Sequence, residues 1–223
     1  MTRMKKHPLF LLVQFVVIVH VSVVSAETLT DVISLQEENF EHIKFSQIKP
    51  NRHLFLNQQL QINVNESASF LMQAFDHARS VKHVSFEWRS DGYPKTKNAL
   101  DEEQKLGDDA VFKLGLLLKT GESISNPFIP KWMKHVDALL NFPSEEMIYL
   151  IADAKHAIGD QWINPYNERV TMISIESIEN KQDWKLAHYE FDAPVDVVAI
   201  WLMADGDNTR SRFTTYIKNI KIE

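Results

Sequence analysis

Alternation of apolar and polar side chains along most of this chain is the feature that most constrains its fold. Residues 60–64 carry Leu, Ile and Val at every second position with Gln and Asn between them, and residues 84–88 repeat the pattern with larger apolar groups. Successive side chains of a strand point to opposite faces, so a period of two predicts half-buried β-strands. Further strands are expected at 69–75, which would pair with 60–64, and at 112–118, 147–151, 170–175, 184–191, 195–203 and 213–222.

One segment departs from this pattern. Trp132, Val136 and Leu139 follow helical spacing and Pro130 suits the first turn of a helix, so one helix is expected within 130–142. About nine or ten strands with one helical insertion predict a mainly β fold, an antiparallel β-sandwich or jelly-roll-like domain. A parallel βαβ architecture is disfavoured because the crossover helices are missing.

The N-terminus has the pattern of an export signal. Arg3, Lys5 and Lys6 precede an apolar run at 9–24, and small residues lead up to Ala26. The run is shorter than the roughly 20 apolar residues that span a bilayer as a helix, which favours cleavage after Ala26 over an uncleaved anchor. We therefore expect a protein that is periplasmic or secreted and leaves the membrane after signal cleavage.

The expected organisation has three parts. Residues 1–26 are the signal peptide, residues 27–43 form a loosely held N-terminal segment, and residues 44–223 form a single β-sandwich domain. The domain has ample length for a hydrophobic core of its own.

Charge and cysteine content exclude several classes of partner and cofactor. The formal net charge of −6 becomes −9 once the three basic residues of the signal are removed, so nucleic acid and anionic membrane surfaces are poor partners. The absence of cysteine excludes disulfides, Cys-ligated zinc and a thiol nucleophile. An exported chain of this size without disulfides must be held by its core, which leans toward a bacterial periplasm.

An acidic turn between the last two predicted strands allows two interpretations. Asp205, Asp207 and a carbonyl at Asn208 or the next residue offer hard oxygen ligands at alternate positions, as a calcium loop does. Three oxygens are too few for calcium, and the acidic pair Asp108 and Asp109 is the obvious source of more. Alternatively, these residues only make a tight reversal, which Asp, Gly and Asn tolerate well.

The same region carries a family resemblance. Residues 198–209 read Val-Ala-Ile-Trp-Leu-Met-Ala-Asp-Gly-Asp-Asn-Thr and are followed by a closing strand, which resembles the C-terminal signature of the DUF3047 family of exported bacterial proteins. Residues 84–88 are similar to that family's aromatic strand, and residues 106–110 to its Gly-Asp-Asp element. The resemblance implies no particular activity, because the family has no assigned function.

Two further residues are candidates for ligand binding. Glu87 lies on the polar face of the strand at 84–88, where it could serve a glycan ligand or a paired-carboxylate glycosidase, or simply face solvent. Trp201 beside the small Ala199 could form a sugar-stacking platform, although an apolar run of this length is typical of a central strand buried on both faces.

These observations leave three functional hypotheses. The chain has no G-x-S-x-G elbow, H-E-x-x-H helix, P-loop or dinucleotide fingerprint. The leading hypothesis is a non-catalytic binding or accessory domain for a glycan or other polar envelope ligand, with Glu87, Trp201, Asp108 and Asp109 as candidate contacts. The alternatives are a carbohydrate-active enzyme that uses Glu87 or the Asp205 and Asp207 pair, and a structural domain that binds a protein partner.

Overall fold

The computed structural model describes residues 31–121, 129–179 and 183–223. The predicted signal peptide lies outside these residues. Within them, no helix is long and apolar enough to cross a membrane.

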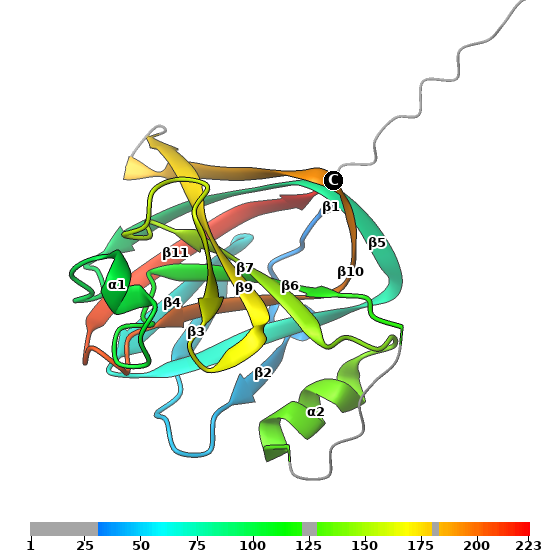
Figure 1. Ribbon diagram of the computed structural model, residues 1–223, viewed down its shortest axis with the longest axis horizontal. Helices are drawn as coiled ribbons and strands as arrows, with labels where there is room; N and C mark the ends of the chain where they lie inside the picture. Colours follow the sequence, from blue (N-terminus) through cyan, green and yellow to red (C-terminus); the bar gives the residue numbers. More distant parts are fainter. Residues whose placement is uncertain (1–30, 122–128, 180–182) are drawn as a thin grey trace, which may run out of the picture.

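Strands dominate the described chain (Figure 1). The strands are β1 (Asp31–Val32), β2 (Glu41–Lys44), β3 (Arg52–Leu56), β4 (Gln59–Asn65), β5 (Ala68–Asp91), β6 (Phe112–Leu118), β7 (Glu146–Ala152), β8 (Gln161–Asn164), β9 (Asn167–Glu179), β10 (Lys185–Asp205) and β11 (Arg212–Ile222). The helices are the 3₁₀ turn η1 (Glu37–Asn39), α1 (Ala99–Glu102) and α2 (Lys131–Leu139).

A single sheet of 11 strands folds over on itself to make the sandwich. Its order is β3-β4-β11-β5-β10-β6-β7-β9-β8, with β1 added to β11 and β2 to β5. The first part of β5 pairs with β2 and the end of β10, whereas its last part pairs with β11 and the start of β10. Figure 1 shows both long strands curving around one side of the molecule. The predicted mainly β, sandwich-like fold is confirmed.

Register shifts in β10 accompany the bend. They lie between Glu190 and Val195 and between Val197 and Ala199, where the pairing with β5 is interrupted. An extra residue on one strand increases the local twist and bends it. The segments predicted as separate strands at 69–75 and 84–88 are therefore two parts of one strand, as are those at 184–191 and 195–203.

The main core lies between the two layers of the folded sheet. Phe86 and Trp88 enter it from β5, Phe112 from β6 and Ile217 from β11, and all four are fully buried. The polar residues that alternate with them in β5 lie on the outer face, as the period of two predicts.

A second apolar cluster covers the outer face of one layer. It takes the alternate side chains of β5, β7, β9 and β10, together with Val136 of α2. Trp132 of α2 packs edge-on against Phe45 and Phe70. The predicted helix within 130–142 is thus present, with Pro130 as its N-cap, and it helps to bury this face.

Three expectations about pairing and order differ from the structure. β4 pairs with β3 and β11, and not with residues 69–75, because the sharp turn at Glu66, whose φ is positive, directs β5 to other partners. β7 and β9 pair in parallel in an otherwise antiparallel arrangement of the described strands. The segment expected to be loosely held is ordered from residue 31 on, because Ile33, Leu35 and Ile43 are buried in the two clusters.

A half-buried histidine, His53, should make the fold sensitive to acid. His53 lies edge-on to His42 with ring centroids 4.5 Å apart, and neither of its ring nitrogens has a hydrogen-bond partner among the described residues. Burial, helped by the neighbouring His42, lowers the pKa of His53 from 6.5 to about 3. Below about pH 6.5 the unfolded chain binds a proton that the folded chain does not, so stability falls as the pH falls.

We therefore predict that acidification from about pH 7 to pH 5 lowers the free energy of unfolding by about 1 to 2 kcal/mol through His53. Urea unfolding of the wild type and of His53→Leu at both pH values measures this contribution. The variant should lose less stability than the wild type, while the exposed-site control His188→Gln should behave like the wild type. The assignment is wrong if His53→Leu keeps the full pH dependence.

Candidate functional site

Three segments meet at one end of the sandwich, which we call the acidic loop end. They are residues 92–111 between β5 and β6, residues 153–166 around β8, and the turn 206–211 between β10 and β11. α1 and the β10–β11 turn lie on the same side of the molecule in Figure 1. Hydrogen bonds join the turn to both other segments, through Asp109 on one side and Tyr166 on the other.

The turn itself is tightly packed. The amide of Gly206 donates to the Ser67 carbonyl at 3.2 Å, and the amide of Ser211 donates to the Gly206 carbonyl at 2.8 Å. A Cβ at Gly206 would lie 2.6 Å from Cγ1 of Val64, so only glycine fits there. The close packing of Gly206 against Val64 fixes the backbone of the neighbouring residues Asp205 and Asp207.

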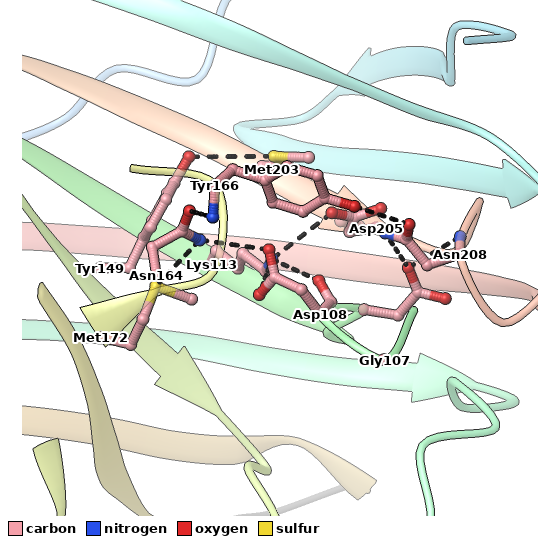
Figure 2. A network of polar contacts seen from close by, with 12 residues as sticks. Gly107, Asp108, Lys113, Tyr149, Asn164, Tyr166, Met172, Met203, Asp205 and Asn208 are labelled. Carbon is pink, nitrogen blue, oxygen red and sulfur yellow. Dashed lines mark hydrogen bonds and ion pairs between the residues drawn. The ribbon is translucent and has the colours of Figure 1, made fainter. Parts of the chain in front are cut away.

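A buried lysine lies at the centre of the site. Lys113 of β6 is 2% exposed, and its ammonium donates to the Asp108 carbonyl at 2.6 Å and to Asp108 Oδ1 at 3.0 Å. It also lies 3.4 Å from Asp205 Oδ2 (Figure 2). Burial alone would lower the pKa of Lys113, but the carboxylates of Asp108 and Asp205 outweigh it and raise that pKa above its usual value. The ammonium therefore stays charged inside the protein.

The period of two predicts Lys113 on a solvent-facing side of its strand, and this expectation is wrong. Every residue of β6 from Phe112 to Leu117 is buried, because the second apolar cluster covers the face that was expected to be wet. Lys113 can be buried there because two carboxylates and a carbonyl satisfy its ammonium.

Asp109 holds the turn in place. Its Oδ1 accepts from the backbone and side-chain amides of Asn208, both at 3.2 Å. Its Oδ2 accepts from the backbone amide of Thr209 at 2.7 Å and from the Thr209 hydroxyl at 2.5 Å. One carboxylate thus connects the start of β6 to the β10–β11 connection through four hydrogen bonds.

Asp205 is the group of the site whose hydrogen bonding is least complete. It is 4% exposed, and its Oδ1 has no hydrogen-bond donor among the described residues. Burial raises the pKa of Asp205 well above its usual value, Lys113 opposes this rise, and the carboxylates of Asp109 and Asp207 add to it. Asp109, Asp205 and the half-buried Asp207 each place one oxygen within 4.8 Å of the others.

A tyrosine and an asparagine near β8 complete the site. The Tyr166 hydroxyl lies 2.7 Å from the Lys105 carbonyl and 3.0 Å from Asn208 Oδ1, while the residue as a whole is 56% exposed. Asn164 donates to Asp108 Oδ2 at 3.2 Å. Figure 2 shows these residues together with Lys113. Neither residue was a candidate from sequence, and the polar turn Asn-Pro-Tyr-Asn at 164–167 is the only local signal.

The structure brings the predicted acidic residues together. Asp108, Asp109, Asp205, Asp207 and Asn208 all belong to the acidic loop end. Their contacts differ from those expected, because Asp108 binds Lys113 and Asn208 donates to Asp109 through both of its amide groups.

The structure places Glu87 outside this site. Its side chain lies on the outer face of β5, where Asn219 donates to it at 2.7 Å and Lys218 lies at 3.2 Å. This arrangement matches the partly solvated strand face that was the alternative interpretation.

Trp201 is also separate from the acidic loop end. Its ring stacks on Phe70 with centroids 3.3 Å apart and meets Trp132 and Tyr149 edge-on at 6.1 and 5.9 Å. Only 6% of Trp201 is exposed, so it is a core residue of a central strand and does not offer an open face to a sugar. The suggestion of a stacking platform at Trp201 is wrong because α2 and its neighbours cover that face.

The chain matches a known protein family over most of its length. A family model described as a protein of unknown function, DUF3047, matches residues 38–221. The chain belongs to the DUF3047 family. The match includes β2 to β11 and all three segments of the acidic loop end, so that end is part of the DUF3047 domain. No curated protein matches this DUF3047 chain significantly.

Several solved structures are remotely similar to the DUF3047 chain. A variant of a family 29 carbohydrate-binding module is 11% identical, with 87% of this chain and 88% of that chain covered and a TM-score of 0.37. The low-affinity xylan-binding module CBM86 from Roseburia intestinalis is 11% identical, with 87% and 94% covered and a TM-score of 0.34. An agarase is 9% identical, with 86% of this chain and 25% of that chain covered and a TM-score of 0.35. At these TM-scores the ligands of those proteins are not transferred to this one.

The role of Asp109 generates a prediction about stability. Asp109→Ala should lower the free energy of unfolding by about 2 to 4 kcal/mol, because two backbone amides and two side-chain donors of the turn lose a charged acceptor. Chemical denaturation measures the change. The control Asp76→Ala, at an exposed position of β5, should change stability by less than about 0.5 kcal/mol. Equal effects of the two substitutions would contradict the role given to Asp109.

Proposed function

We propose that the protein is an exported, non-catalytic binding domain that holds a glycan or another polar envelope ligand at the acidic loop end. The observation that carries this proposal is the side chain of Tyr166, an exposed residue that is held at its hydroxyl and set beside acidic and amide groups. Export rests on the N-terminal sequence pattern alone, which supports an encounter with envelope polymers.

The chemistry around Tyr166 suits a sugar. A pyranose ring has an apolar face that packs on a flat aromatic side chain, and hydroxyls around its edge that need acceptors and donors. Tyr166 offers the ring, and Asn208, whose Oδ1 meets the Tyr166 hydroxyl, is a polar neighbour. Burial raises the pKa of Tyr166, as do the nearby charges of Asp108 and Asp207, so its hydroxyl stays protonated near neutral pH.

A hydrolytic role finds less support at this site. Asp205 and Asp207 place oxygens within 4.8 Å of one another, near the roughly 5 Å separation of the carboxyl groups in retaining glycosidases. Asp205 is nevertheless buried and shares its other oxygen with Lys113, so it does not face a bound glycosidic bond. The pair is better suited to holding the turn than to attacking a substrate.

Binding should depend on the aromatic ring of Tyr166. We predict that the wild type is retained by at least one envelope polysaccharide on a glycan array or in a cell-wall pull-down. Tyr166→Ala should weaken that binding about tenfold, as expected for a loss of roughly 1 to 1.5 kcal/mol of aromatic contact. Tyr166→Phe keeps the ring and should bind more tightly than Tyr166→Ala.

Leu56→Ala is the control, because Leu56 is exposed on β3 and lies outside the acidic loop end. It should bind as the wild type does. Two results would contradict the proposal: retention by no polysaccharide, or equal binding of the wild type and Tyr166→Ala. Release of new reducing ends from a bound polysaccharide would show that the domain is catalytic.

A further inference from the structure

We propose that Asp109, Asp205 and Asp207 form a calcium site at the β10–β11 connection. The three carboxylates come from two segments about a hundred residues apart in sequence, and each places one oxygen within 4.8 Å of the other two. The site does not depend on the glycan proposal, because it concerns a cation held by three carboxylates and not a ligand that packs on Tyr166.

The first argument is the charge of the cluster. The cluster contains four carboxyl groups, those of Asp108, Asp109, Asp205 and Asp207. The one ammonium beside them, that of Lys113, forms ion pairs with Asp108 and Asp205. Asp108, Asp109 and Asp205 are buried, and the single ammonium cannot balance the negative charge of the whole cluster, which makes its burial costly. A bound divalent cation would neutralise the carboxylates that Lys113 does not reach.

The second argument is the unsatisfied oxygen of Asp205. Lys113 contacts Oδ2, whereas Oδ1 is fully buried without a donor among the described residues. One oxygen of Asp207 lies within 4.8 Å of one oxygen of Asp205, so the two carboxyl groups lie close together. A cation coordinated by both groups would satisfy the buried oxygen.

The ligand set favours calcium among the common cations. All three groups are carboxylates, which suit hard ions, and the cluster contains no histidine or cysteine. Calcium holds oxygens at about 2.3 to 2.6 Å, so two ligands of one ion can be separated by up to about 5 Å, and the observed spacing meets this limit. The half-buried Asp207 leaves room on the solvent side for waters that complete the coordination.

The structure also changes the ligand set expected from the sequence. Asp109 joins the set because one of its carboxylate oxygens lies within 4.8 Å of oxygens of Asp205 and Asp207. The N–H groups of Asn208 donate to Asp109, and its side-chain oxygen accepts from the Tyr166 hydroxyl.

Calcium titration of the chelator-treated protein tests the site. Calorimetry should give saturable binding of one calcium ion, and saturating calcium should raise the melting temperature by about 5 °C. Asp207→Asn should abolish both effects and still fold, because Asp207 is half-buried and does not contact Lys113. Asp207→Ser serves as a second variant with the same expectation, and both are checked for native circular dichroism.

Asp192→Asn is the matched control, since Asp192 is an exposed carboxylate elsewhere on β10. It should bind calcium as the wild type does. The proposal is overturned if the wild type shows neither binding nor a thermal shift, or if Asp207→Asn keeps the response. An equal response to magnesium would overturn the assignment to calcium.

Discussion

The buried ammonium of Lys113 is the interaction on which the acidic loop end depends. It joins β6 to Asp108 in the segment before that strand and to Asp205 at the end of β10. Removing a buried charge from such a network leaves its partners desolvated and unpaired, which costs about 3 to 5 kcal/mol. Asp109, Asn164 and Tyr166 then extend the network from this centre to the surface.

The folded sheet explains why these groups meet. β5 and β10 pass through both layers, so the end of β10 and the segment after β5 arrive at the same end of the sandwich. β6 pairs with the end of β10, which places Lys113 opposite Met203 and close to Asp205. The core therefore holds these polar groups at one end of the sandwich, which is the placement that the proposed ligand site requires.

Local sequence patterns predicted most of the strands and helix α2, whereas contacts between residues far apart in sequence determine which side chains meet in the site. The period of two identified the inward faces of 84–88 and 112–118, and helical spacing identified α2. The alternation of side chains does not reveal whether the second face of a strand is covered, so it predicts a solvent-exposed Lys113. Its partner Asp205 lies 92 residues away in the sequence, so no local pattern indicates this ion pair. The acidic residues were found because carboxylates between apolar strands are conspicuous, whereas Tyr166 needed the fold to bring it to them.

A double-mutant cycle on Lys113 and Asp205 tests the central claim most directly. Unfolding free energies of the wild type, Lys113→Met, Asp205→Asn and the double variant are measured in the presence of chelator. Lys113→Met alone should cost at least about 3 kcal/mol, and adding Asp205→Asn should recover at least about 1 kcal/mol because the stranded carboxylate is removed. If Lys113→Met costs less than about 1 kcal/mol and the two effects simply add, Lys113 does not hold the acidic loop end together.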